Sequence, residues 1–147
     1  GALGGSLSGR HLHFEPRIHE AQILHRTARL HAMIDVSDGI ASDVRHIWRE
    51  SGVGVLIDAR AVPIHDDVDP SLPFDERLHH ALCDGEDFEL LLAVEEDDAR
   101  RLLDDPPIDL PLTRIGETDR ETSCRLRLPD GRISPLPEGG WTHRWSG

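Results

Sequence analysis

Lysine is missing from this sequence, because all 16 of its basic residues are arginine. Many nucleotide-binding loops use a lysine, and Schiff-base chemistry requires one. These residues can therefore provide neither a phosphate-loop lysine nor a Schiff-base lysine. If the chain binds a phosphate, then metal ions, backbone amides or arginine must hold it.

Cysteine is scarce. Cys83 and Cys124 are the only two, and they lack the C-x-x-C spacing of a redox or zinc motif, which indicates a reducing compartment. No apolar run approaches the roughly 20 residues of a membrane span, and no signal segment opens the chain. We therefore expect a cytoplasmic protein with no membrane partner.

Positively charged residues are few: the chain has 16 basic and 28 acidic residues, and its formal net charge is −12. A surface of this sign repels nucleic-acid backbones and anionic membranes. Nucleic acid is therefore not an expected partner.

The opening residues show neither helical nor strand periodicity. Residues 1–12 are rich in glycine and serine, and the only methionine of the chain is Met33. We interpret residues 1–12 as a connector from an N-terminal domain that this chain lacks, and residues 13–147 as one C-terminal domain.

The remaining chain alternates between helical and strand patterns. The predicted helices cover residues 18–30, 40–51, 73–83 and 95–105, and the predicted strands cover 31–36, 53–59, 88–94, 112–119 and 123–128. This order predicts an α/β (α+β) fold: a layered α-β-α domain with helices packed on a mixed sheet.

A polar turn follows the strand predicted at 31–36. Asp35, Ser37 and Asp38 lie there, at the carboxyl end of a strand and the amino end of a helix, where open α/β sheets bind ligands. Carboxylates suit Mg²⁺, and the hydroxyl and the amides of the helix start suit a phosphate. The alternative is that Ser37 only caps the helix. We interpret Asp43, further along the helix, as a solvated residue.

A second acidic cluster, Asp84-Gly85-Glu86-Asp87, leads into the strand at 88–94. Side chains alternate between the two faces of a strand, so an acid here can point inward, which is costly unless it meets a cation or donors. Glu86 or Asp87 is therefore a candidate site residue. The alternative is an ordinary polar turn ahead of a strand.

The tail contains Gly139-Gly140-Trp141, in which the glycines would let the indole swing onto a planar or cationic ligand. The alternative is that Trp141 anchors the chain end in the core. The ten histidines show no zinc spacing, so we interpret them as surface or packing residues.

Four blocks of sequence resemble the thiamine-monophosphate kinase family, in the family's order and with similar spacing: GSLSGRHLHFEPRIHEA, HAMIDVSDGIASDVRHIWRESGVG, ALCDGEDFELLL and GGWTH. The match covers nearly all of the chain and is weakest between residues 95 and 135. The resemblance implies the fold of the C-terminal domain of aminoimidazole ribonucleotide synthase, which belongs to the same wider superfamily.

The resemblance also implies an activity: a kinase that transfers the γ-phosphate of ATP to thiamine monophosphate, giving thiamine diphosphate, with Mg²⁺ ions between the reacting anions. It implies that Asp35 and Asp38 bind metal, that Ser37 contacts the nucleotide, and that Glu86 and Trp141 bind the substrate. No residue is assigned as a catalytic group. A carboxylate such as Glu86 can pair with the cationic thiazolium of thiamine.

The family places further metal-binding aspartates, nucleotide contacts and dimer-forming strands in a preceding domain. We therefore expect the full-length protein to be a homodimer and this chain alone to be inactive. Two alternatives are a ligand-binding module without catalysis, and another ATP-dependent member of the superfamily. The latter would be favoured if Glu86 and Trp141 lay far from the turn at 35–38.

Overall fold

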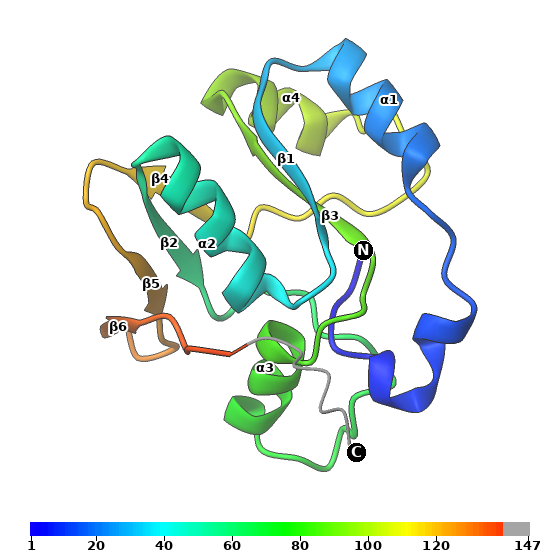
Figure 1. The fold of residues 1–147 in the computed structure, drawn as a ribbon, viewed down its shortest axis with the longest axis vertical. Coiled ribbons are helices and arrows are strands. Elements are labelled where there is room, and N and C mark those ends of the chain that lie inside the picture. The colour runs from blue at the N-terminus through cyan, green and yellow to red at the C-terminus, as the bar shows by residue number, and fades with distance from the viewer. Residues whose placement is uncertain (140–147) are drawn as a thin grey trace, which may run out of the picture.

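The computed structural model describes residues 1–139. These residues form four α-helices and six β-strands, preceded by two short 3-10 turns at Ser6–Ser8 and Arg10–Leu12 (Figure 1). The helices are α1 (Ile18–Thr27), α2 (Ile40–Ser51), α3 (Phe74–Cys83) and α4 (Glu96–Asp104). The strands are β1 (Leu30–Val36), β2 (Gly54–Asp58), β3 (Glu89–Val94), β4 (Gly116–Asp119), β5 (Cys124–Arg127) and β6 (Ile133–Pro135). The predicted alternation of helices and strands is confirmed.

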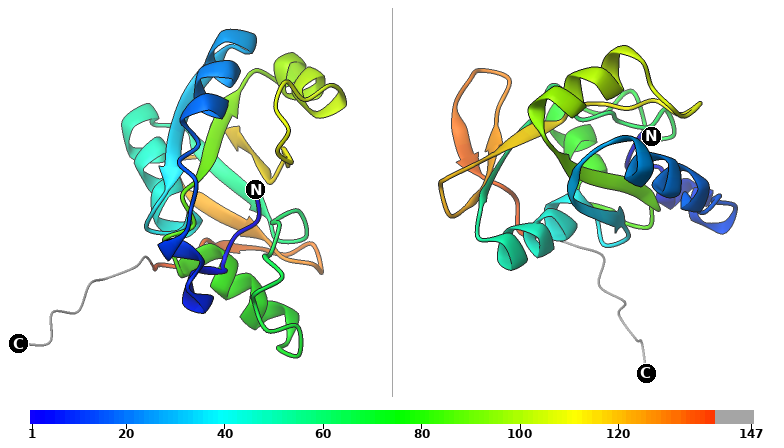
Figure 2. Two further views of the ribbon diagram at one scale, coloured as in Figure 1. Left: turned by 90° about the vertical axis from the view of Figure 1, so that its right-hand side faces the viewer. Right: turned by 90° about the horizontal axis from the view of Figure 1, so that it is seen from above.

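The strands form two sheets, although the sequence predicted one mixed sheet. β1 and β3 pair antiparallel as a two-stranded ribbon. The second sheet has the order β4-β2-β5-β6 and is mixed, because β2 and β5 run parallel while the other two pairs are antiparallel. Figure 2 shows α1 and α4 on opposite sides of the ribbon.

The main core lies between the four-stranded sheet, α2 and α3. Apolar positions at helical spacing put Ile40, Ala41 and Val44 of α2 inside, and β2 buries both faces, which fits its run of apolar residues. α2 ends where predicted, because Gly52 takes the left-handed conformation (φ 70°) and closes the last turn. The core also contains Val36, Val55, Ile57, Leu78, Ala81, Leu82, Leu126 and Leu136.

The segment predicted as a connector packs against this domain. Leu3 is only 3% exposed and belongs to the core. Its amide donates to the Pro63 carbonyl at 2.9 Å, and its carbonyl accepts from the His65 amide at 2.8 Å. Residues 1–12 therefore contribute to the fold, and their role as a link to another domain stays a prediction.

Among residues 1–139, no helix is both long and apolar enough to cross a lipid bilayer. The acids Glu96, Asp97 and Asp98 lie in the first turn of α4, where the partial positive charge of the helix amino end favours them.

Candidate functional site

The turn between β1 and α2 depends on a glycine. Gly39 has φ 97°, and a Cβ atom there would lie 2.9 Å from the carbonyl oxygen of Leu82, the penultimate residue of α3. A side chain would force these backbones apart. Gly39 therefore lets the amino end of α2 sit against the carboxyl end of α3.

Asp43 corrects the sequence analysis, which interpreted it as solvated. Its side chain is buried (2% exposed), and its Oδ2 accepts hydrogen bonds from the amides of Ser37 at 3.0 Å and Asp38 at 3.1 Å. Ser37 does not cap α2, because the N-cap position is Gly39 and has no side-chain cap. The turn is held by a carboxylate that reaches back from the helix.

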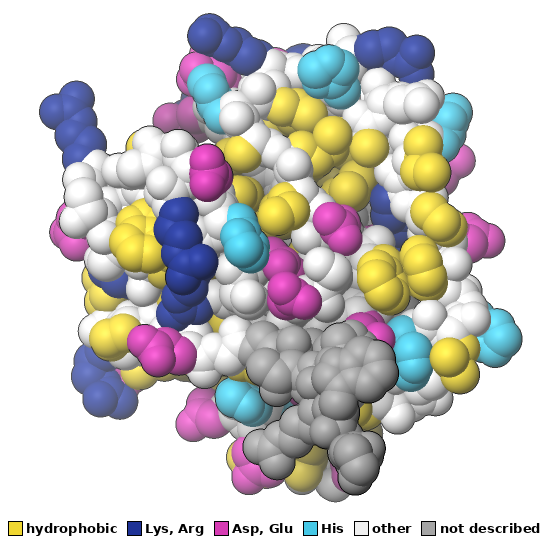
Figure 3. Space-filling view, in the orientation of Figure 1, with side chains coloured by type: hydrophobic (Ala, Val, Ile, Leu, Met, Phe, Trp, Pro, Cys, Tyr) yellow, Lys and Arg dark blue, Asp and Glu magenta, His cyan; other side chains and the backbone are white. Residues whose placement is uncertain are grey.

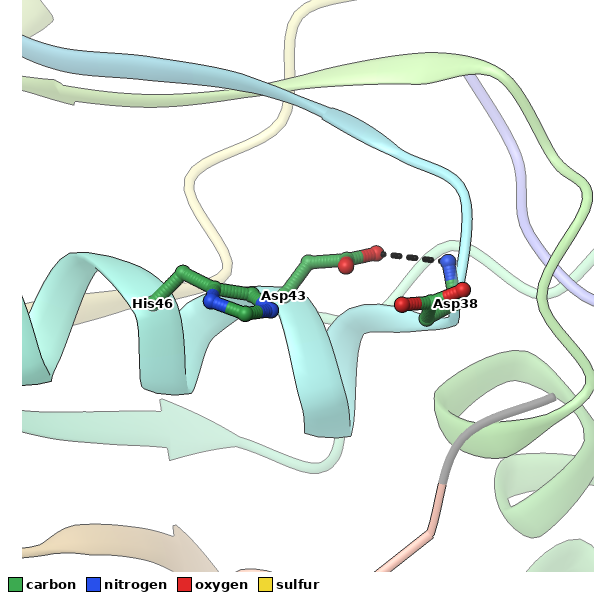
Figure 4. Close-up of side chains that lie close together, drawn as sticks. All are labelled: Asp38, Asp43 and His46. Carbon is green, nitrogen blue, oxygen red and sulfur yellow. Dashed lines mark hydrogen bonds between the residues drawn. The ribbon is translucent and has the colours of Figure 1, made fainter. Parts of the chain in front are cut away.

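Asp38, Asp43 and His46 each offer a ligand atom, and these atoms all lie within 4.8 Å of one another. Figure 4 shows Asp43 and His46 on adjacent turns of α2, beside Asp38 of the preceding turn. In Figure 3, acidic and histidine side chains gather over the amino end of α2. Two carboxylates and an imidazole this close together can hold a divalent cation.

The electrostatics of this cluster are unfavourable without a cation. Burial raises the pKa of the Asp43 carboxyl to about 6, the charges of Asp38 and Asp35 add to the rise, and the two amide hydrogen bonds oppose it. Among the described side chains, no arginine forms an ion pair with any of the three aspartates. A bound cation would relieve this repulsion.

The acidic turn before β3 lies directly against the β1–α2 turn. The Glu86 amide donates to the Ser37 carbonyl at 2.7 Å, and the Phe88 amide donates to the Val36 carbonyl at 2.8 Å. Glu86 (φ 55°) and Phe88 (φ 52°) both adopt the left-handed conformation, which is rare for a bulky residue such as phenylalanine. Such backbone strain is typical of functional sites.

Asp87, one of the two acids predicted as inward-pointing candidates, is buried, and so is Glu89, which the sequence analysis did not single out. Asp87 Oδ1 accepts from the Gly4 amide at 2.9 Å. Glu89 accepts two hydrogen bonds from the Arg17 guanidinium, at 3.0 and 3.1 Å, and this interaction raises the pKa of Arg17. Both acids hold the N-terminal residues on the ribbon, so Glu86 is the better candidate for ligand contact.

Asp35 faces a groove of about 640 Å³ between the ribbon and α1. Its walls include Arg17 and Met33, and the rings of Phe14 and Phe88 stack there with centroids 4.1 Å apart. Figure 3 shows hydrophobic side chains spread over this part of the surface. A ligand near Asp35 would therefore meet a carboxylate and an apolar wall.

Trp141 lies outside the described residues. The last described residue, Gly139, is close to the site: a Cβ atom there would lie 3.2 Å from Sγ of Cys83, at the end of α3. Cys83 is next to Leu82, whose carbonyl oxygen meets Gly39. Residues 1–139 thus bring Ser37, Asp38 and Glu86 to one end of the fold.

The sequence analysis missed Asp43 and His46 as site residues. Asp43 and His46 are three residues apart in a predicted helix, which places them on one face, and Asp38 lies in the turn just before that helix. That spacing was the available signal.

Comparison with known proteins identifies relatives along most of the chain. Residues 5–129 match the family model described as AIR synthase related protein, C-terminal domain. A curated thiamine-monophosphate kinase from Rhodopirellula baltica is 35% identical over 97% of this chain. The chain spans 46% of that relative's length, so it corresponds to about half of it.

Solved structures share the fold. Thiamine-monophosphate kinase from Stenotrophomonas maltophilia K279a superposes with a TM-score of 0.66 and 35% identity, over 81% of this chain and 36% of that one. The structure described as AaThiL complexed with AMPPCP and TMP superposes with a TM-score of 0.70 and 24% identity, over 98% of this chain and 49% of that one. These matches confirm the predicted α/β fold and the resemblance on which the site residues were chosen.

Proposed function

We propose, from the premise that this chain belongs to the AIR synthase related family, that it is the C-terminal domain of a thiamine-monophosphate kinase. The full-length protein would transfer the γ-phosphate of ATP to thiamine monophosphate and form thiamine diphosphate. The proposal is supported by relatives of that name, which match nearly the whole chain.

The observation that carries this proposal is the pair of backbone hydrogen bonds between the β1–α2 turn and the turn before β3. Through them the Glu86 backbone lies directly against Ser37, with Asp38 next in the chain. A thiamine-phosphate kinase must hold a metal-bound nucleotide and an organic cation side by side. An arrangement with Glu86 on a separate surface would have favoured a different substrate.

The residues present fit Mg²⁺. The buried carboxylate of Asp43 and the exposed one of Asp38 are hard oxygen donors, and Asp35 contributes further negative charge near them. We propose that Asp35 and Asp38 bind the metal, with Asp43 supporting them. When bound, Mg²⁺ would neutralise charge on the phosphates of ATP and of the acceptor.

The residues of this chain have separate roles in the proposed reaction. The Ser37 hydroxyl, on the turn whose backbone Asp43 holds in place, orients the nucleotide. The Glu86 carboxylate would pair with the cationic thiamine moiety, and Trp141 would be the second substrate-binding residue. Phosphoryl transfer is catalysed mainly by positioning and charge stabilisation, so the chain would act by positioning the two anions, and the remaining contacts would come from the N-terminal half of a homodimer.

Calorimetry of the full-length protein tests these roles. We expect Asp38→Ala to weaken Mg²⁺-dependent binding of AMPPCP, an ATP analogue, by roughly tenfold or more, and Glu86→Ala to weaken binding of thiamine monophosphate by a similar factor. The control is Asp97→Ala, at a side chain of α4 that is 97% exposed. Unchanged binding of both ligands in the two site variants would contradict the roles assigned to Asp38 and Glu86.

The dependence on the N-terminal half has its own test. The chain that begins at Gly1 should show no turnover of thiamine monophosphate, whereas the full-length protein should convert it to thiamine diphosphate. Measurable turnover by the chain alone would contradict the proposed division of the site between two domains.

A further inference from the structure

The turn before β3 adopts a backbone conformation that its residues disfavour. Gly85, Glu86 and Phe88 all have positive φ (69°, 55° and 52°), and only the glycine adopts such a φ readily. In the left-handed region the Cβ atom of any other residue crowds a neighbouring carbonyl oxygen. A conformation of this kind persists only where the surrounding contacts hold it in place.

Backbone hydrogen bonds to the β1–α2 turn are the first of these contacts. The amides of Glu86 and Phe88 donate to the carbonyls of Ser37 and Val36, at 2.7 and 2.8 Å. With β3 paired in the ribbon, a change of Phe88 to negative φ would rotate the peptide groups that precede it. Such a rotation would break these hydrogen bonds and move Glu86 away from Ser37.

Residues that precede α1 supply the second kind of contact. The ring of Phe14 stacks on the ring of Phe88, with centroids 4.1 Å apart and an interplanar angle of 26°. The Gly4 amide donates to Oδ1 of Asp87 at 2.9 Å, and Gly4 follows Leu3, which belongs to the core. Two successive residues of the turn, Asp87 and Phe88, are thus tied to a segment far earlier in the chain.

The aromatic stack lies outside the apolar core. Phe14 is 42% exposed, Phe88 is only partly buried, and neither is among the described residues of the core cluster. The stack therefore adds little buried apolar area. Its effect is on geometry, because at negative φ the Cβ atom of Phe88 would point elsewhere and its ring would leave the ring of Phe14. The stack thereby favours the left-handed conformation.

We propose that Phe14 is a positioning residue for the substrate: its ring holds Phe88 in the left-handed conformation and so keeps Glu86 against the β1–α2 turn, where its carboxylate meets the organic cation. Phe14 acts through the turn and not by contact with the substrate. The β1–α2 turn is also held by Asp43, so nucleotide binding there should not depend on Phe14. This inference rests on the proposed role of Glu86.

Steady-state kinetics of the full-length protein tests the inference. Phe14→Leu should raise the KM for thiamine monophosphate about fivefold, and by no more than Glu86→Ala does, because it acts only through Glu86. The KM for ATP should stay within about twofold of the parent value. Phe14→Tyr keeps the aromatic ring and should behave like the parent. Leu12→Ala, at a side chain that is 71% exposed, is the matched control and should leave both KM values unchanged.

The double variant Phe14→Leu/Glu86→Ala distinguishes positioning from direct contact. If Phe14 acts through Glu86, its loss has no effect once Glu86 is absent, so the double variant should have the KM of Glu86→Ala alone. A further rise of that KM in the double variant, an unchanged KM in Phe14→Leu, or an equal rise of both KM values in Phe14→Leu would each overturn the inference while the role of Glu86 stands. An unchanged KM in Glu86→Ala would overturn the proposed role of Glu86 and this inference together.

Discussion

The buried acids of the two adjacent turns differ in their partners. Glu89 and Asp87 meet donors from the chain itself: the Arg17 guanidinium binds Glu89, and the Gly4 amide binds Asp87. Asp43 is as deeply buried, but its nearest charged neighbours are other acids, Asp38 and Asp35.

This difference in partners distinguishes acids that stabilise the fold from acids that are suited to bind a cation. A buried carboxylate with an arginine partner is neutralised within the fold, while a buried carboxylate among acids has a raised pKa and favours a cation from outside. We therefore expect removal of a partner to destabilise the first group, and removal of a carboxylate to stabilise the second at the expense of metal binding.

The largest expected effect is loss of the arginine partner. Arg17→Ala leaves the Glu89 carboxylate, whose side chain is 5% exposed, without its guanidinium, and should lower the free energy of unfolding by about 3 kcal/mol. Urea denaturation measures this. The control is Arg100→Ala, which removes an exposed i,i+4 pair with Glu96 and should cost less than about 0.5 kcal/mol. Equal effects of the two would contradict the assignment of Glu89 as a structural acid.

The next largest effect is an increase in the free energy of unfolding, caused by substitution of Asp43. Burial raises the pKa of Asp43 from 3.8 to about 6, so between these pH values the folded state binds more protons than the unfolded state, and stability falls as pH rises through that window. Asp43→Asn cannot ionise and should be more stable than the parent at pH 7 by about 2 kcal/mol, without this fall. Denaturation at pH 4, 5, 6 and 7 measures it, with Asp97→Asn as control. A variant that is less stable at pH 7 would refute the prediction.

Magnesium should narrow the difference in stability between the parent and Asp43→Asn. In the full-length protein, Mg²⁺ at ten times its dissociation constant should raise the free energy of unfolding by about 1.4 kcal/mol in the parent. Asp38→Asn and Asp43→Asn should reduce this gain, whereas Asp97→Asn should retain it. An equal Mg²⁺ effect in all four proteins would place the binding site elsewhere.

The smallest effect concerns the aromatic pair beside the structural acids. Phe14→Leu removes the stack on Phe88 and should cost about 1 kcal/mol, because Phe14 is 42% exposed and loses little buried area. Leu12→Ala, at a side chain that is 71% exposed, is the control and should be neutral. Equal melting temperatures for the two variants would show that the stack contributes nothing.

Much of the fold followed from local patterns. The periodicity of residues 40–51 predicted α2, and the apolar runs predicted β1, β2 and β3, because these signals are local. The division into two sheets was not predicted, since strand pairing depends on contacts between residues far apart in sequence.

Only the part of the site that has a local sequence signature was predicted. The turn at Asp35, Ser37 and Asp38 has a local signature, whereas the burial of Asp43 arises only when the end of β1 folds back over the first turns of α2. The contact between Ser37 and Glu86 joins residues 49 positions apart, from turns ahead of α2 and of β3, and no local pattern encodes it.

The central claim is that Asp38 and Asp43 lie at a divalent-cation site, whereas Glu89 does not. The most direct test is NMR of histidine-labelled full-length protein titrated with Mn²⁺, because the paramagnetic ion broadens nearby signals and His46 lies within the cluster. The account predicts that His46 broadens at the first additions in the parent and in Arg17→Ala, but not in Asp38→Asn. Broadening of all histidines together, or of His46 equally in Asp38→Asn, would contradict it.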